Sequence, residues 1–206
     1  MSNLIFDEAT HTYTLDGIQL PSVTEITRFC AYDYKSDRPW LAEAAARRGT
    51  AVHEACALID YGEEPEETPE IAGYLKAYRR FLKDWKPEWK LIECPIADRN
   101  MKMAGTMDRF GIIHNAPAIL DIKTGQLHDA ALSAQLTAYK MIFSWDPRCG
   151  YGKIQSLYAL KLSKDGTYEL RHVEPNSNLV NACRTLHKAT RSEERRVGKE
   201  CRSRWS

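Results

Sequence analysis

The sequence has no apolar run of about eighteen residues, the length that a helix needs to cross a bilayer. Its first residues, MSNLIFDEATH, also lack the basic stretch followed by an apolar stretch that marks a secretory signal. From these two absences we expect a soluble cytoplasmic protein with no membrane partner.

Closely spaced cysteines are absent as well. The six cysteines, at positions 30, 56, 94, 149, 183 and 201, are scattered, and no C-x-x-C occurs among them. This spacing argues against a disulfide framework and against a zinc ribbon.

A strong net charge is the third absence, because 29 basic and 28 acidic residues give the chain a formal charge of +1. The segment 191–206, RSEERRVGKECRSRWS, holds six basic and three acidic residues, which leaves residues 1–190 at −2. Any affinity for DNA must then come from local basic patches. Residues 191–206 have no apolar periodicity, and they resemble the translation of a sequencing adapter. We therefore expect a non-native, disordered tail.

The length is sufficient for one domain with a sizeable core, which we place at residues 1–190. Residues 4–20 predict a small hairpin, and residues 22–30 predict a helix that opens with the capping-box pattern S-V-T-E. An alanine-rich helix over 39–47 follows, so residues 1–48 are expected to form an N-terminal hairpin with helices.

Two strand-like segments, 107–114 and 118–123, are rich in Ile, Leu and Phe and flank the turn-forming tripeptide N-A-P. They predict an antiparallel hairpin. Because side chains alternate along a strand, Asp121 and Lys123 share one face. The hairpin returns Asp108 beside this pair, so two carboxylates and an amine converge at one end of a sheet.

This combination of side chains has a chemical use. Carboxylates are the oxygen ligands that Mg²⁺ and Mn²⁺ prefer, and such a metal polarises a phosphodiester and lowers the pKa of a bound water. A nearby lysine orients that water or offsets the charge that builds up on the phosphate. The alternative is an ordinary D-x-K on the surface of a strand, because this pattern alone is a weak signal.

The next predicted helix, over residues 128–143, carries a polar residue on its apolar face. The apolar positions recur at helical spacing: Leu132, Leu136, Tyr139 and Phe143. Gln135 lies in the same stripe, where a glutamine must find hydrogen-bond partners or carry a cost of ~1–3 kcal/mol. Gln135 and Tyr139 are one turn apart, so both can reach the polar end of the hairpin. The alternative is a satisfied polar residue at the edge of the core.

Four short patterns follow one another along the chain: G-T-A-V-H at 49–53, G-T-M-D-R at 105–109, D-I-K-T-G at 121–125 and Q-L-T-A-Y at 135–139. In this order they resemble the PD-(D/E)XK nuclease superfamily, and within it the RecB-like exonuclease branch that is common in phage recombination genes. The resemblance covers roughly residues 4–188. Each pattern is loose but the ordered set is specific, and Met107 stands where the superfamily's name has a proline.

The resemblance implies roles for the site residues. It assigns Mg²⁺ or Mn²⁺ to four ligands: His53, Asp108, Asp121 and the carbonyl of Ile122. It also implies that Lys123 positions the attacking water, while Gln135 and Tyr139 brace the site and contact DNA. Without the resemblance, His53 flanks the apolar stripe of a predicted helix over 50–61, and a structural role is the alternative.

Some relatives in this branch hold an iron–sulfur cluster, with one early cysteine and a close group of cysteines near the C-terminus. Cys30 fits the early position, but this sequence has no close C-terminal group. We therefore expect no cluster.

Other charged residues leave two interpretations open. The amphipathic helix predicted over 69–85 carries a basic group that is either solvated or a track for the DNA backbone: Arg79, Arg80 and Lys83. Arg109 is expected to support phosphate or a neighbouring carboxylate, and it is also a candidate for contact with DNA. Glu93, on a strand predicted over 89–98, either contributes to a second metal position or is an exposed carboxylate.

We expect an α/β fold with a restriction-endonuclease-like PD-(D/E)XK core: a helix, three antiparallel strands, a crossover helix and further strands, forming a mixed sheet flanked by helices. The further strands are predicted over 154–162 and 167–172, and a last helix is predicted over 176–189. The expected function is that of a metal-dependent DNA exonuclease in phage recombination or DNA repair. Its expected partners are DNA and a phage single-strand annealing protein, in a bacterial or phage-infected cell.

Two alternatives remain beside the exonuclease. One is a structure-specific or restriction-type endonuclease on the same core, and the other is a catalytically silent DNA-binding module. The presence of Asp108, Asp121 and Lys123 argues against the silent module, because a decayed site would tolerate their loss.

Overall fold

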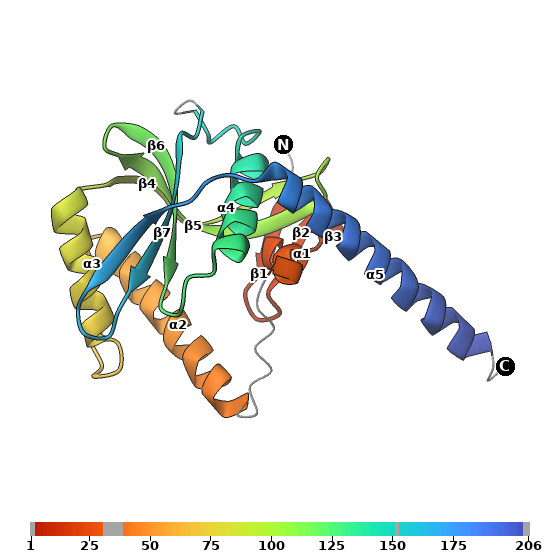
Figure 1. Ribbon diagram of the computed structural model, residues 1–206, viewed down its shortest axis with the longest axis horizontal. Helices are drawn as coiled ribbons and strands as arrows, with labels where there is room; N and C mark the ends of the chain where they lie inside the picture. The colour runs from red at the N-terminus through yellow and green to blue at the C-terminus, as the bar shows by residue number, and fades with distance from the viewer. Residues whose placement is uncertain (1–2, 31–38, 151–152, 204–206) are drawn as a thin grey trace.

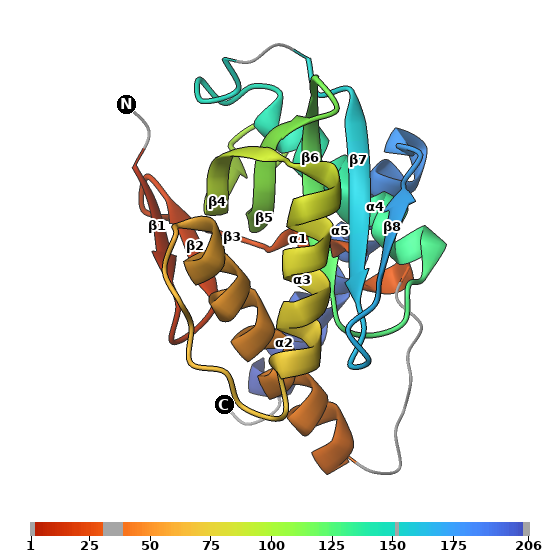
Figure 2. The ribbon, with the colours of Figure 1, turned by 90° about the vertical axis from the view of Figure 1, so that its left-hand side faces the viewer.

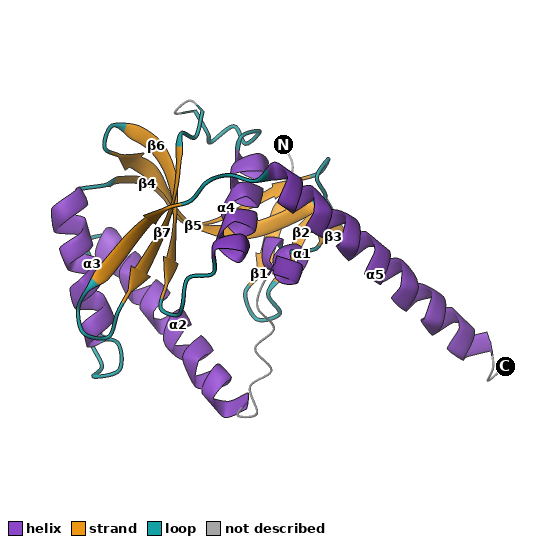
Figure 3. Ribbon diagram, viewed as in Figure 1, coloured by secondary structure: helices purple, strands orange, loops and turns teal. Residues whose placement is uncertain are grey.

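The structure, a computed structural model, describes residues 3–30, 39–150 and 153–203. Within these residues the chain forms a three-stranded antiparallel sheet near the N-terminus and a five-stranded mixed sheet, with helices on both faces of the larger sheet (Figures 1 and 3). The expected α/β fold with a mixed sheet flanked by helices is confirmed.

The elements follow this order along the chain: β1 (Leu4–Asp7), β2 (Thr12–Leu15), β3 (Ile18–Leu20), α1 (Val23–Thr27), the 3-10 turn η1 (Arg28–Cys30), α2 (Pro39–Asp60), α3 (Ala72–Trp85), β4 (Glu88–Asp98), β5 (Met103–Ile113), β6 (Ala116–Lys123), α4 (Asp129–Phe143), β7 (Ser156–Leu162), β8 (Tyr168–His172) and α5 (Ser177–Ser203).

The larger sheet has the strand order β4-β5-β6-β7-β8. β4, β5 and β6 pair antiparallel, as the predicted hairpin requires, whereas β6 and β7 pair in parallel. Parallel neighbours need a crossover connection, and α4 supplies it. The carboxyl end of β6, which carries Asp121 and Lys123, therefore lies beside the start of α4.

Each face of the sheet has its own apolar cluster. α2 and α3 pack on one face, where Val52, Tyr78 and Phe81 meet the strand residues Leu120 and Ile122. α1, α4 and α5 pack on the other face around a second cluster. Figure 2 shows α2 and α3 in front of the strands. Burial on both faces explains why β5 and β6 are almost continuously buried.

Two tight turns use residues with a left-handed backbone. Asp16 and Gly17, with φ of 49° and 80°, join β2 to β3 as expected. Between β5 and β6 the turn residues are His114 and Asn115, with φ of 49° and 61°, so the predicted turn at 115–117 is displaced. Pro117 lies inside β6, because the two-residue turn lets pairing begin at Ala116.

α2 is one continuous helix where the sequence predicts two, over 39–47 and 50–61. Gly49 and Thr50 lie inside it, and the Thr50 hydroxyl donates to the carbonyl of Ala46 across 3.3 Å. A glycine in a helix costs only about 1 kcal/mol relative to alanine. No proline interrupts the helix, so that cost does not end it. His53 consequently lies on a long helix rather than in the first turn of a short one.

α5 also exceeds its prediction, since it continues to Ser203 rather than ending at 189. It therefore enters the segment for which the sequence predicts disorder. The buried side chains described on α5 all precede residue 190: Val180, Cys183 and His187. In the described part of the chain, none of the helices combines the length and the apolar character that a membrane crossing needs.

Candidate active site

Three metal-ligating side chains from three elements meet beside the middle of β5. His53 comes from α2, Glu93 from β4 and Asp108 from β5, and one possible ligand atom of each lies within 4.8 Å of the others. His53 Nδ1 is 3.6 Å from Glu93 Oε1 and 3.5 Å from Asp108 Oδ2. We call these three residues the donor cluster.

The ring of His53 is held on its other side by the backbone. Its Nε2 donates to the carbonyl of Ile122 across 3.0 Å, which leaves Nδ1 facing the two carboxylates. Burial lowers the pKa of His53, but Asp108 and Glu93, with a smaller contribution from Asp121, raise it to about 9. A proton therefore sits on Nδ1 at neutral pH, at the place that a divalent cation would take.

Asp108 connects the donor cluster to the neighbouring strand. It is 8% exposed, and its Oδ2 accepts a hydrogen bond of 2.7 Å from the backbone N–H of Ile122. The backbone of Ile122 thus bonds to two members of the donor cluster, through its N–H to Asp108 and through its C=O to His53. Because Ile122 stands between Asp121 and Lys123, this is the juxtaposition that the predicted hairpin requires.

Asp121, Lys123 and Gln135 form a second polar group, which we call the lysine group. Lys123 Nζ is 2.7 Å from Asp121 Oδ2 and donates to Gln135 Oε1 across 3.2 Å. Gln135 Nε2 donates to Asp121 Oδ1 across 3.1 Å and lies 3.4 Å from the hydroxyl of Tyr139. The glutamine on the apolar stripe of α4 is therefore a satisfied polar residue, and its partners are the predicted site residues.

The charges of the lysine group depend on one another. Burial raises the pKa of Asp121 to about 6, although Lys123 lowers it. Burial lowers the pKa of Lys123, but Asp121 and Asp108 raise it above its usual range. Lys123 is thus a cation at neutral pH, and with 31% of its side chain exposed it can donate hydrogen bonds to a water or an anion.

The packing of Tyr139 explains the glycine of the G-T-M-D-R pattern. A Cβ added to Gly105 would lie 2.8 Å from Cε1 of Tyr139, closer than side chains approach in proteins. The tyrosine ring thus packs directly on the backbone of β5. Gly49, the glycine of the other pattern, has no such constraint, since its nearest contact would be Thr124 Oγ1 at 3.7 Å.

Glu93 was open to two interpretations from its sequence, and the structure brings it into the donor cluster. It also accepts a hydrogen bond of 2.9 Å from Arg109 NH1. Arg109 has no exposed surface and donates through Nε to Asp60 Oδ2 across 2.6 Å. Arg109 therefore supports carboxylates, and its buried position leaves it no surface for the DNA contact considered from the sequence.

Sequence reasoning missed Asp60 and Tyr78. The Asp60 side chain is 1% exposed, and its Oδ2 also accepts a hydrogen bond of 2.6 Å from the hydroxyl of Tyr78 on α3. Burial raises the pKa of Asp60, although Arg109 and the hydrogen bond from Tyr78 each lower it. One signal was present: Asp60 follows Cys56 by four residues, so it continues the apolar stripe of its helix.

The three basic residues proposed for a DNA track lie on the outer side of α3. Arg79 pairs with Glu67 and, across 2.9 Å, with Glu64. Arg80 is 3.7 Å from Asp84, and Lys83 is exposed. Tyr78, next to Arg79 in sequence, faces inward. The ion pairs of Arg79 and Arg80 reduce the positive charge on the outer side of α3. DNA binding by Arg79, Arg80 and Lys83 stays a prediction.

The residues present fit a divalent cation. The donor cluster offers an imidazole nitrogen and carboxylate oxygens, which are ligand types that bind divalent cations in proteins. The carbonyl partner on His53 Nε2 is the usual outer contact of a metal-bound histidine. Asp121 stands outside the donor cluster, because both of its oxygens face members of the lysine group.

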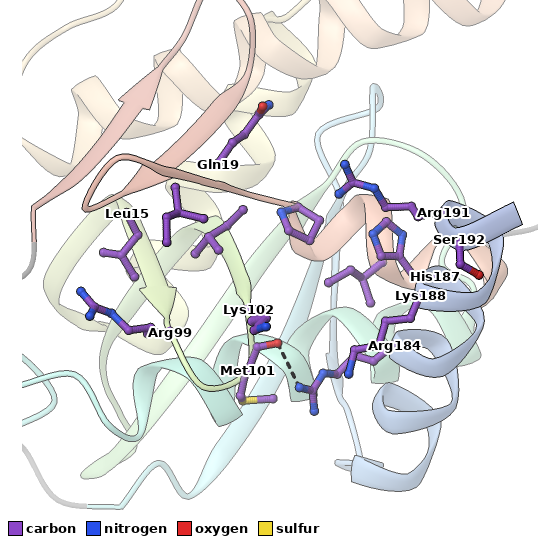
Figure 4. Close-up of a pocket in the computed structure, with 14 residues that line it drawn as sticks. Leu15, Gln19, Arg99, Met101, Lys102, Arg184, His187, Lys188, Arg191 and Ser192 are labelled. Carbon is purple, nitrogen blue, oxygen red and sulfur yellow. Dashed lines mark hydrogen bonds between the residues drawn. The ribbon is translucent and has the colours of Figure 1, made fainter. Parts of the chain in front are cut away.

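A pocket of about 640 Å³ lies elsewhere, between the β2–β3 hairpin, the β4–β5 turn and α5 (Figure 4). Aliphatic side chains line it together with basic side chains that include Lys102, Arg184 and Lys188. Arg184 also donates to the carbonyl of Met101 across 3.0 Å. No residue of the donor cluster or of the lysine group lines this pocket.

No protein-family model matches this chain, and no curated protein matches its sequence. Among solved structures, the alkaline exonuclease LHK-Exo from Laribacter hongkongensis is similar with a TM-score of 0.48 and 10% identity, over 91% of this chain and 95% of that chain. LHK-Exo in complex with dAMP is similar with a TM-score of 0.42 and 12% identity, over the same shares. Both likenesses are distant.

Proposed function

We propose that this protein is a Mg²⁺- or Mn²⁺-dependent deoxyribonuclease that hydrolyses phosphodiester bonds from DNA ends. The observation that carries the proposal is the position of the lysine group directly beside the donor cluster. The two groups share the backbone of Ile122, so a cation-binding set of ligands and a hydrogen-bond-donating ammonium face one region.

The roles follow from the contacts. A divalent cation at the donor cluster would polarise a phosphodiester and lower the pKa of a bound water. Lys123, oriented by Asp121 and Gln135, would donate to that water or to the phosphate. The hydroxyl of Tyr139 accepts a hydrogen bond from Gln135 and so helps to hold it, and the tyrosine ring packs on β5.

The proposed ligand set includes Asp121 and the Ile122 carbonyl beside His53 and Asp108. Each of these two groups now has a protein partner, Lys123 and His53 respectively. A metal bound to the Ile122 carbonyl would share this oxygen with His53, and a metal bound to Asp121 would share a carboxylate oxygen with Lys123. Glu93 is a further candidate ligand, and its carboxylate is not paired with Lys123.

The proposal extends to the biological setting that the sequence resemblance implies. The enzyme would act on DNA in the cytoplasm of a bacterial or phage-infected cell, in phage recombination or DNA repair. A phage single-strand annealing protein would be its partner there.

The test uses purified protein with linear duplex DNA labelled at either the 5′ or the 3′ end, and a closed circle of the same sequence. With Mn²⁺ the linear DNA should shorten from its ends while the circle stays intact, and EDTA should stop the reaction. Lys123→Ala should be inactive, whereas Lys164→Ala, in the exposed β7–β8 turn, should match the wild type. Cutting of the circle would instead identify an endonuclease, and binding without cleavage would identify a silent module.

A further inference from the structure

Glu93 has an unusual backbone for a residue in the middle of a strand. Its φ is +44°, in the left-handed region that side chains other than glycine rarely adopt. Such a conformation costs on the order of 1–3 kcal/mol, so surrounding contacts must hold it. The flanking residues Ile92 and Cys94 remain paired with Arg109 and Met107 of β5, which confines the distortion to Glu93.

The contacts that hold Glu93 converge on Arg109. One nitrogen of its guanidinium, NH1, donates both to Glu93 Oε1 across 2.9 Å and to the backbone carbonyl of Asp108 across 2.8 Å. Arg109 thus touches two members of the donor cluster at once, although it offers no ligand itself. A guanidinium cannot lose its proton in a protein, so it stays a donor at any working pH.

The guanidinium of Arg109 is in turn held by a buried carboxylate. Its Nε donates to Asp60 at the last position of α2, and Asp60 is held by the hydroxyl of Tyr78 on α3. The Asp60 and Arg109 side chains are 1% and 0% exposed. A buried pair of this kind is weak evidence for a role in stability, because desolvation offsets much of its attraction.

We infer that the buried Asp60–Arg109 pair positions Glu93 as a metal ligand, so that the cation is held by three side chains from α2, β4 and β5. This inference rests on the proposed metal site, but not on the reaction catalysed there. Arg109 and Asp60 are positioning residues, and of the three ligand side chains they contact only that of Glu93, because the bond to Asp108 is to its backbone carbonyl. Without them, the Glu93 carboxylate would turn away from His53.

The test measures Mn²⁺ affinity by calorimetry in a double-mutant cycle. Arg109→Met combined with Asp60→Asn removes both buried charges together, which avoids leaving one of them unpaired. This pair of changes should weaken Mn²⁺ binding on the order of tenfold, the usual effect of losing an outer contact of a metal site. In a Glu93→Ala background the same pair of changes should cause no further loss.

Arg109→Lys is the second variant, for use if the double change prevents folding. Lysine keeps the charge, but it cannot hold Asp60 and Glu93 in the forked arrangement of a guanidinium. It should also weaken Mn²⁺ binding in the wild-type background and not in the Glu93→Ala background. Melting temperatures of all variants are recorded in the absence of metal.

An equal loss of affinity with and without Glu93 would overturn the inference, and so would unchanged Mn²⁺ binding in the Glu93→Ala protein. DNA cleavage is assayed in parallel to separate the two claims. Mn²⁺ affinity that depends on Arg109, without cleavage, would refute the proposed function and leave the inference standing. Cleavage with no effect of Arg109 on affinity would do the reverse.

Discussion

The donor cluster and the lysine group lie side by side but are built in different ways. The lysine group draws on one strand and the helix that follows it, and its carboxylate has its own ammonium partner at 2.7 Å. The donor cluster draws on α2, β4 and β5, and its two carboxylates face a histidine nitrogen. On the proposed function, the donor cluster would hold the metal cation, whereas the lysine group already contains a cation, the ammonium of Lys123.

The two groups should therefore fail differently. Loss of Lys123 or Gln135, which are not proposed ligands, should affect the reaction more than metal binding. Loss of a residue from the donor cluster should affect metal binding first. The following predictions test this difference, from the largest expected effect to the smallest.

Lys123→Ala and Asp121→Ala should each lower the rate of DNA cleavage by on the order of 10²–10³ or more, the effect of losing one electrostatic stabiliser. Lys123→Ala should leave Mn²⁺ affinity nearly unchanged, because the lysine is not a ligand. Single-turnover cleavage and calorimetry on the same preparations measure the two effects. Turnover close to wild type in either folded variant would remove that residue from the proposed mechanism.

His53→Ala should raise the metal concentration needed for half-maximal cleavage far more than it changes affinity for DNA. Imidazole suits Mn²⁺ better than Mg²⁺, which prefers oxygen ligands, so the variant should also lose preference for Mn²⁺. Metal titrations of cleavage, with DNA binding measured separately, distinguish this from a structural histidine. If His53 had only a structural role, its replacement would lower the melting temperature and leave the metal concentration for half-maximal cleavage unchanged.

Glu93→Gly and Glu93→Ala should weaken Mn²⁺ binding equally, since neither keeps a carboxylate. Their stabilities should differ, because only alanine retains the Cβ that makes a φ of +44° unfavourable. We expect the glycine variant to be more stable by about 1 kcal/mol in urea unfolding without metal. Equal stabilities, or a more stable alanine variant, would show that the strain at this position is negligible.

Truncation after residue 190 should have the smallest effect. The described core residues of α5 precede this point, and residues 191–193 are exposed. The shortened protein should melt at the same temperature and keep its full rate of cleavage. A clear fall in melting temperature would mean that the continuation of α5 packs on the domain.

The central part of this protein could be predicted from its sequence because the deciding contacts are local. Alternation along β6 places Asp121 and Lys123 on one face, and helical spacing places Gln135 and Tyr139 one turn apart. The short connection between β5 and β6 allows only antiparallel neighbours, which brings Asp108 close. Their partners in the structure are the ones that these periodicities require.

Only the tertiary structure decided which buried residues support the donor cluster. Arg109 is a charged residue on β5, and nothing in its neighbours along the chain predicts that it is fully buried. Its burial depends on three features from distant parts of the chain. The end of α2 supplies Asp60, α3 supplies Tyr78, and the pairing of β4 with β5 brings Glu93 to the guanidinium. Local sequence preferences likewise do not predict the left-handed backbone of Glu93. It persists because contacts from distant segments outweigh the preference of the residue itself.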